Sequence, residues 1–316
     1  NNAVLVTGAG SLWPNTSLTV GDYGSGNRLT ISDGGTVADS YGCVGDEKSA
    51  SNNVVMVTGA NSLWTNRSYL SVGDYGSGNR LTISGGGTVA NNGCYLGDTH
   101  YASNNVVLVS GADSLWDNGS WLRVGNQGSC NGLTISNGGA VANDSGFVGY
   151  GGLASSNAVL VTGAGSLWNN RTNLSVGDSG SWNRLTISDG ATVASGNAYV
   201  GQDSRASNNA VLVTGASSLW TNRNDLHVGC FGSGNRLTIT NGGMVKSENG
   251  YVGCGSNASD NAVLVTGAGS LWPNTSLTVG GDGWGNRVTI SDGGTVADTY
   301  GCVGDEKSAS NNVVMV

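Results

Sequence analysis

The chain has 316 residues and a formal net charge of −8, with 55 Gly but only 2 Pro and 2 Phe. Its 13 Lys and Arg residues are spread thinly, which argues against a nucleic-acid partner, and no apolar run predicts membrane insertion. Hydrophobic residues make up 38% of the chain, a low share that, with so much Gly, would suggest disorder in a sequence without repeats. This sequence is periodic, so the repeat decides the fold class.

Asparagines at a nearly constant interval mark the repeat. Thirteen of them recur every 26 residues, with two steps of 25: Asn2, Asn27, Asn53, Asn79, Asn105, Asn131, Asn157, Asn183, Asn209, Asn235, Asn261, Asn286 and Asn312. The second and fourth residues after each Asn are aliphatic, which is the pattern of a short strand with one buried face. Each Asn shares that face, so we predict an internal ladder of hydrogen-bonded carboxamides.

Two unlike units of 26 residues alternate along the chain. Residues 27–37 read Asn-Arg-Leu-Thr-Ile-Ser-Asp-Gly-Gly-Thr-Val, and residues 53–64 read Asn-Val-Val-Met-Val-Thr-Gly-Ala-Asn-Ser-Leu-Trp. An aliphatic residue followed by Gly also occurs once per unit, as at Val20-Gly21 and Val44-Gly45. Aligning the units residue for residue after the Asn places Val37 and Leu63 in one interior stripe. Six 52-residue repeats of two units each then fill residues 1–316.

Equal unit lengths along the whole chain are typical of parallel coiling, in which each residue lies above its equivalent one turn earlier. We therefore predict one right-handed parallel β-helix, with about 12 rungs of about 26 residues and three short strands per rung. Residues 1–57 and 260–316 are identical at 51 of 57 positions. From this return of the sequence to its start we expect either an excerpt of a longer array or end-to-end stacking, with further copies of the chain as partners.

The recurring Val-Thr-Gly-Ala-Gly-Ser-Leu-Trp, Leu-Thr-Val-Gly and Asn-Arg-Leu-Thr-Ile-Ser-Asp-Gly-Gly-Thr-Val elements resemble a bacterial repeat associated with autotransporter passengers and PEP-CTERM surface proteins. The resemblance extends over essentially the whole chain. It implies a β-helical segment of a secreted or surface-displayed bacterial protein, with a structural or adhesin-like role. It assigns no catalytic residue, and no signal, membrane anchor or translocator barrel is recognised in the sequence.

One Trp occurs in every second unit: Trp13, Trp64, Trp116, Trp168, Trp220 and Trp272. With Leu63 pointing inward, strict alternation places Trp64 outward, where a row of indoles about 9.6 Å apart would stack on the sugar rings of an extracellular glycan. The alternative, which we favour, is that each Trp packs at a corner over the Ala aligned with it in the neighbouring units, as at Ala38 and Ala90.

An Asn-x-Ser/Thr sequence follows the Trp in five of the six repeats, at Asn15, Asn66, Asn118, Asn170 and Asn274. These positions form a line of candidate N-glycosylation sites. Asn also suits a turn for its own conformational reasons, which is the simpler interpretation.

Acidic residues and cysteines follow several of the aliphatic-Gly pairs. Asp22, Asp46, Asp74 and Asp98 stack in successive rungs and are weak candidates for a Ca²⁺ site, but the calcium-binding repeat motif itself is missing. We expect no other metal or cofactor. Cys230 and Cys254 occupy equivalent places in consecutive rungs, about 4.8 Å apart, a distance that allows either a disulfide or two free thiols.

A polysaccharide-active enzyme is the remaining alternative, because β-helices also serve such enzymes. Catalysis would need a local departure from the repeat that gathers ionisable groups into one cleft. His100 and His227 lie in unrelated loops, Lys246 and Glu248 form one small irregularity, and the arginines of alternate rungs face away from the core. The sequence therefore favours a non-catalytic, extracellular or cell-surface rod or filament segment.

Overall fold

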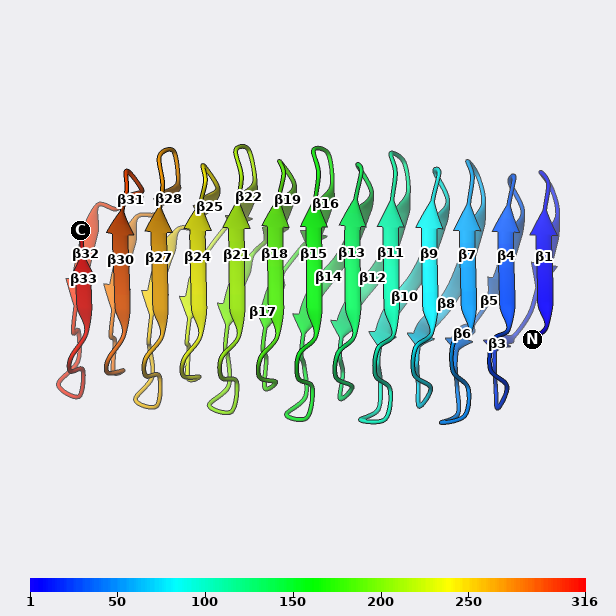
Figure 1. The fold of residues 1–316 in the computed structure, drawn as a ribbon, viewed down its shortest axis with the longest axis horizontal. Helices are drawn as coiled ribbons and strands as arrows, with labels where there is room; N and C mark the ends of the chain where they lie inside the picture. The colour runs from blue at the N-terminus through cyan, green and yellow to red at the C-terminus, as the bar shows by residue number, and fades with distance from the viewer.

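The computed structural model describes residues 1–316 and confirms the predicted fold class, a parallel β-solenoid of about 12 turns with no helix. The strands nearest the viewer in Figure 1 run upward, the chain returns downward behind them, and each new turn lies further to the left. This course defines a right-handed coil with the two termini at opposite ends of a rod. No segment of the structure forms a helix with the length and apolar character that crossing a bilayer requires.

The first face is a continuous parallel sheet made by the strand that follows each asparagine of the series. Its thirteen strands, in spatial order, are β1 (Ala3–Thr7), β4 (Arg28–Ser32), β7 (Val54–Thr58), β9 (Arg80–Ser84), β11 (Val106–Ser110), β13 (Gly132–Ser136), β15 (Ala158–Thr162), β18 (Arg184–Ser188), β21 (Ala210–Thr214), β24 (Arg236–Thr240), β27 (Ala262–Thr266), β30 (Arg287–Ser291) and β33 (Val313–Met315). The pairing is in register throughout, so each strand lies directly over its equivalent in the previous rung.

The remaining strands form two further parallel rows on the other side of the solenoid. The row after the turn contains β2 (Leu12–Pro14), β5 (Thr36–Asp39), β16 (Leu167–Asn170), β19 (Thr192–Ser195), β22 (Leu219–Asn222), β25 (Met244–Lys246), β28 (Leu271–Pro273) and β31 (Thr295–Ala297). The next row contains β3 (Ser17–Val20), β6 (Tyr41–Val44), β17 (Asn173–Val176), β20 (Asn197–Val200), β23 (Leu226–Val228), β26 (Asn249–Val252), β29 (Ser276–Val279) and β32 (Tyr300–Val303). In four successive rungs of the N-terminal half, one long strand spans both rows: β8 (Leu63–Val72), β10 (Thr88–Leu96), β12 (Leu115–Val124) and β14 (Ala140–Val148).

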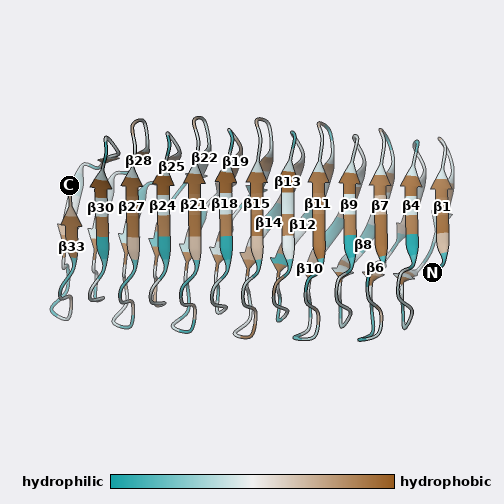
Figure 2. Cartoon of the chain, viewed as in Figure 1, coloured by the Kyte–Doolittle hydropathy of each residue, from teal (hydrophilic) through white to brown (hydrophobic).

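A narrow hydrophobic core fills the interior along the whole rod. The strands of the first face alternate strictly, as in β9, where Leu81 and Ile83 are buried and Arg80 is exposed. The resulting apolar strands with polar loops at both ends are visible in Figure 2. Each rung contributes only a few aliphatic side chains, and stacking joins them into one cluster of 52 buried residues. This arrangement explains how a chain of low hydrophobic content forms a core.

The two kinds of unit differ at one turn, and this difference overturns part of the predicted register. Ser32 pairs with Thr58, but the next pair is Thr36 with Leu63, so the second kind of unit has one additional residue in the turn. Val37 is therefore the partner of Trp64, whereas our alignment paired Val37 with Leu63. Because a shift of one residue reverses the direction of every side chain in a strand, the outward orientation of the Trp row, one of the two hypotheses from the sequence, is wrong.

Candidate functional site

The thirteen asparagines of the series form a continuous hydrogen-bonded column inside the rod. In mid-chain, Asn131 donates its backbone N–H and its Nδ2 to Oδ1 of Asn157, at 2.9 and 3.2 Å. Asn157 donates to Asn183 in the same way, at 3.0 Å for both bonds. The same double donation joins every neighbouring pair of the series.

The second Nδ2 hydrogen of each mid-chain asparagine holds the loop of the preceding rung. Nδ2 of Asn157 donates to the carbonyl of Gly128 at 3.0 Å, and that of Asn183 donates to the carbonyl of Ala154 at 3.1 Å. Both hydrogens of the carboxamide nitrogen and both acceptor sites of its oxygen are therefore used. A buried polar group is thus fully satisfied only when a rung lies on either side of it.

The Gly of each aliphatic-Gly pair lies directly against this column. Gly125 has a φ of +78°, and a Cβ at that position would collide with the carboxamide of Asn157. Gly177 has the same relation to Asn209. In the sequence, the recurring Asn and the recurring aliphatic-Gly pair are two separate periodic features. Only the coiled structure reveals that Gly is required because the Asn of the next rung occupies the space where a side chain would lie.

The Trp row lies inside the rod and is not a sugar-stacking surface, contrary to one of the two hypotheses from the sequence. Trp13 is half-buried in the first rung, and the other five, Trp64, Trp116, Trp168, Trp220 and Trp272, are fully buried. Each indole occupies the position that Val holds in the neighbouring rungs. Our alignment had assigned it to the position of Ala, one residue further along the strand. The additional turn residue described above is the reason for the inward orientation.

Polar side chains in the preceding rungs accept the indole N–H groups of four of the buried Trp residues, whereas the N–H of Trp220 has no partner. Trp116 donates to Oδ1 of Asn91 at 3.1 Å, and Trp168 donates to Oδ1 of Asn143 at 2.9 Å. In an earlier rung Trp64 donates to Oδ2 of Asp39 at 3.0 Å, and burial raises the pKa of this carboxyl to about 6. Sequence reasoning missed these acceptors because the residue alignment was displaced by one position in this strand row and paired each Trp with Ala, where the structure pairs it with Val.

Three of the five candidate glycosylation sites are inaccessible in the folded rod. Asn66, Asn118 and Asn170 follow the inward-facing Trp by two residues, so they share its direction and are buried. Oδ1 of Asn118, for example, accepts a hydrogen bond of 2.8 Å from Asn91. In the folded rod these three candidate sites are therefore out of reach of a modifying enzyme, whereas Asn15 and Asn274 remain partly exposed.

The acidic residues after the aliphatic-Gly pairs form a column on one flank, as their spacing predicted. Backbone hydrogen bonds stack Asp46, Asp74 and Asp98 in successive rungs, while Asp22 is exposed at the start of the column. Burial, followed by repulsion from the neighbouring carboxylates of Asp98 and Asp46, raises the pKa of Asp74 to about 6. Calcium binding by this column remains a prediction.

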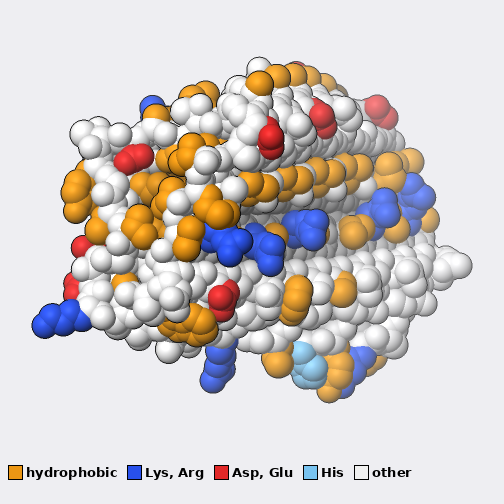
Figure 3. Space-filling model, turned by 60° about the vertical axis from the view of Figure 1, so that its left-hand side comes forward, with side chains coloured by type: hydrophobic (Ala, Val, Ile, Leu, Met, Phe, Trp, Pro, Cys, Tyr) orange, Lys and Arg blue, Asp and Glu red, His pale blue; other side chains and the backbone are white.

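The outer side of the first sheet carries a row of basic side chains. Arg28, Arg80, Arg184, Arg236 and Arg287 are exposed on alternate rungs, and none forms an ion pair. Figure 3 shows basic side chains in a line along the rod beside bands of hydrophobic ones. Gly132 interrupts the row, and a shallow trough of about 430 Å³ lies there, with Val106, Leu108, Ala158 and Leu160 among its lining and Arg80 and Arg184 at its ends.

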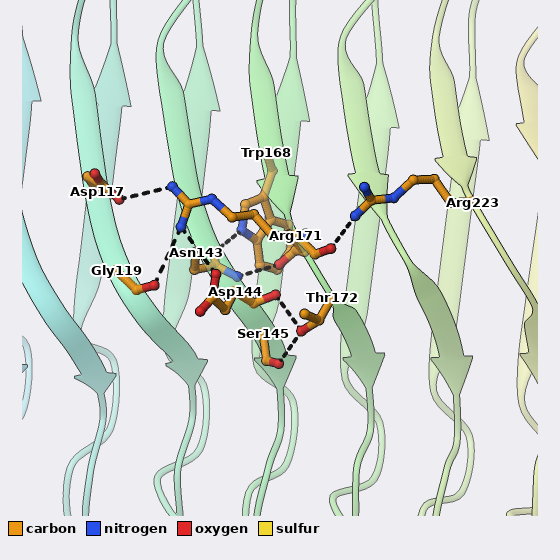
Figure 4. A network of polar contacts seen from close by, with 10 residues as sticks. Asp117, Gly119, Asn143, Asp144, Ser145, Trp168, Arg171, Thr172 and Arg223 are labelled. Atoms are coloured by element: carbon orange, nitrogen blue, oxygen red, sulfur yellow. Dashed lines mark hydrogen bonds and ion pairs between the residues drawn. The ribbon is translucent and has the colours of Figure 1, made fainter.

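The two ion pairs of the chain belong to one surface network at the corner between the second and third strand rows. Arg171 lies 3.2 Å from Asp144 and 4.0 Å from Asp117, and it also donates to the carbonyl of Gly119 two rungs earlier. Arg223, two rungs later, donates to the carbonyl of Arg171 (Figure 4). Exposed pairs of this kind contribute little individually, so the network mainly links neighbouring corner loops.

A cluster of His227, Cys230 and Cys254 departs from the repeat. The sulfur atoms and a ring nitrogen of these residues all lie within 4.8 Å of one another, and Nδ1 of His227 is 3.2 Å from Sγ of Cys254. The sequence left either a disulfide or two free thiols open at Cys230 and Cys254. In the structure both are free thiols, and Sγ of Cys254 lies beside the imidazole. Burial lowers the pKa of His227, which favours the neutral ring.

No protein-family model matches the sequence, and no curated protein is significantly similar to it. Among solved structures, the chain is similar to a TibC-catalysed, hyper-glycosylated fragment of TibA. The two chains are 15% identical, the match covers 98% of this chain and 94% of that one, and the TM-score is 0.49.

Proposed function

We propose that this chain is a structural, adhesin-like rod segment of an extracellular or surface-displayed bacterial protein, with no catalytic role. The observation that carries the proposal is the asparagine column. It makes the same contacts in every mid-chain rung, with Asn131, Asn157 and Asn183 as representative members. A stack in which each rung completes the hydrogen bonding of its neighbours distributes stability evenly and gives a stiff spacer of defined length.

The recurring sequence elements described above support the bacterial surface assignment, because they resemble repeats of autotransporter and PEP-CTERM proteins. The near identity of residues 1–57 and 260–316 supports assembly by continuation of the coil, in which a second copy supplies the next rung. Such continuation would satisfy the asparagine column across the junction as it is satisfied within the chain.

Deletion of one complete repeat tests the rod function. Removing residues 105–156 joins Asn104 to Asn157 and preserves both the asparagine column and the alternation of the two kinds of unit. We expect a folded rod that is shorter by two rungs, about 9.6 Å, in small-angle scattering or electron microscopy. Loss of folding, or an unchanged length, would contradict a function based on equivalent repeats.

A 26-residue deletion is the matched control. Removing residues 105–130 also preserves the asparagine interval, but it eliminates the Trp116 rung and brings Val89 against Val141. The interior then lacks an indole, and two short turns become neighbours, so this variant should be less stable than the 52-residue deletion.

Antibody labelling of intact and lysed native cells tests surface display, and labelling only after lysis would refute it.

The trough on the first sheet supports a second candidate function, contact with an acidic extracellular polysaccharide. Its apolar floor at Val106 and Ala158 suits the flat face of a sugar ring, and Arg80 and Arg184 at its ends suit carboxylate groups. Binding to immobilised acidic glycans should weaken with salt and with Arg80→Ala or Arg184→Ala. Arg223→Ala, on another face, is the control, and an equal loss in all three variants would refute this function.

A further inference from the structure

We propose that His227, Cys230 and Cys254 form a binding site for one Zn²⁺ ion on the flank of the rod. The proposal does not depend on the rod function. It rests on three ligand atoms of the type that zinc prefers, brought together from two consecutive rungs within 4.8 Å of one another.

The topology explains why these three side chains meet. His227 lies in β23 with its side chain outward between the buried Leu226 and Val228. The chain then turns at Gly229, and Cys230 follows on the same flank. Cys254 belongs to the next rung, and its backbone N–H donates to the carbonyl of Gly229 at 3.1 Å, which places it directly beside Cys230.

The distances are compatible with tetrahedral coordination. With Zn–S distances of about 2.3 Å and Zn–N distances of about 2.0–2.1 Å, the ligand atoms of a tetrahedral site lie roughly 3.5–3.8 Å apart. Nδ1 of His227 lies 3.2 Å from Sγ of Cys254, and all three ligand atoms lie within 4.8 Å of one another. Small side-chain rotations are enough to bring these distances into the tetrahedral range. Binding forms metal–thiolate bonds and releases the thiol protons to solvent.

The imidazole of His227 is held in a fixed orientation by its neighbours. It stacks between Tyr199 and Tyr251, with ring centroids 5.1 and 4.8 Å away and interplanar angles of 9° and 11°. Asp225 lies two residues before it on the same strand face and accepts a hydrogen bond of 2.8 Å from Asn249. A ligand already oriented by packing loses little conformational freedom on binding, and the nearby carboxylate favours a cation.

Access and a fourth ligand come from a hollow of about 270 Å³ beside Cys254. Asp282, Asp305 and Glu306 are among its lining residues. The hollow leaves room for water as the fourth ligand, and its carboxylates attract a cation toward the open side. Three protein ligands with one open position is the arrangement in which zinc retains a water molecule.

The position of the cluster within the repeat is a second, independent argument. The residue after the aliphatic-Gly pair is Asp in most other rungs and Asn, Gln, Tyr or Gly in the rest, and Cys occurs there only in these two consecutive rungs. The residue before the pair is His only at His227. Structural needs of the repeat do not demand these residue types, because neighbouring rungs fold in the same way without them.

The test is a zinc titration of the full chain, reduced and freed of metal, in competition with a chromophoric chelator. We expect one Zn²⁺ per chain, and Co²⁺ in its place should give the thiolate charge-transfer and visible bands of a tetrahedral cysteine site. Cys230→Asn, Cys254→Ser and His227→Tyr should each weaken Zn²⁺ binding by more than about 100-fold, because even loss of an outer-shell partner costs 10–100-fold.

These variants are chosen to keep the fold. Asn occupies the Cys230 position in another rung, at Asn126, and Tyr199 and Tyr251 occupy the His227 position on either side. Thermal melting in the absence of metal checks that they fold normally. Cys130→Ser, which removes an exposed thiol elsewhere, is the control and should bind Zn²⁺ like the unmodified chain.

Three outcomes would overturn the proposal. One is less than one Zn²⁺ bound per reduced chain. Another is a loss of affinity in Cys130→Ser equal to that in the site variants. The third is a Cys230–Cys254 disulfide in the isolated chain, found by peptide mass spectrometry, together with no zinc uptake after reduction.

Discussion

Replacing one mid-chain asparagine of the column, Asn157→Leu, should destabilise the rod strongly. The substitution removes the Oδ1 atom that accepts the backbone N–H of Asn131 and the Nδ2 group that donates to the carbonyl of Gly128. Nδ2 of Asn131 still donates to the carbonyl of Ala102, and Oδ1 of Asn183 still accepts the backbone N–H of residue 157. Two buried groups, one N–H and one carbonyl, are therefore left without a partner.

The magnitude follows from those two groups. An unsatisfied buried donor or acceptor costs about 1–3 kcal/mol, so the free energy of unfolding should fall by about 2–6 kcal/mol. The leucine gains no compensating space, since the carboxamide of Asn157 lies against Gly125. The control is Asn169→Leu, the same chemical change at a partly exposed position on β16 whose side chain makes no hydrogen bond. We expect its effect to be below about 0.5 kcal/mol.

Denaturant unfolding and amide hydrogen exchange together provide the assay. Repeat arrays need not unfold in one step, so the exchange rate of the Asn131 amide gives a local measure that does not assume two states. In Asn157→Leu this amide should lose protection, while the equivalent amide of Asn53, four rungs away, should keep it. An unchanged unfolding midpoint, or an equal loss in Asn169→Leu, would refute the proposed role of the column.

Three further substitutions test other parts of the interior. Gly125→Ala should cost about 2–4 kcal/mol by collision with Asn157 and a strained φ. Gly132→Ala, where a Cβ makes only ordinary contacts of 3.6 Å or more and the neighbouring strand already carries Ala158, should be neutral in the same melt. Burial raises the pKa of Asp39 from an unfolded value of 3.8 to about 6, so its contribution to stability is present below pH 3.8 and is lost as the pH rises through 6. Asp39→Asn, which copies Asn91 of the next repeat, should therefore reduce the decline in melting temperature between pH 4 and pH 8, and an unaltered pH profile would contradict this account. Trp168→Phe should cost about 2–4 kcal/mol, because it creates a void and leaves Oδ1 of Asn143 unpaired. Trp182→Phe, at an exposed position, is the control and should cost almost nothing. Equal unfolding midpoints in urea for the two variants would argue against a buried indole.

The outcome at the Trp row shows where sequence reasoning fails in a repeat protein. The register of the first sheet is insensitive to turn length, because the strand after each Asn pairs with its equivalent whatever turn follows it. Beyond the turn, one additional residue between Thr58 and Leu63 reverses every side chain. Trp64 and Asn66 consequently point inward, so the stacking surface and the glycan line disappear together. Comparing the number of residues in the two turns, three and four, was the signal in the sequence that would have revealed this.

The sequence by itself determined the parallel coil, the rung length and the inward direction of the asparagines, because each depends on a period that is written once per turn. The right-handed course followed from the general rule for parallel crossovers. Only the tertiary structure decided what the glycines are for and which residues meet across rungs. Gly125 and Asn157 are 32 positions apart in the numbering, and His227 and Cys254 are 27 apart, so neither pair falls on the repeat interval. Loops and turns of unequal length set those contacts, and their combined geometry cannot be read from periodicity alone.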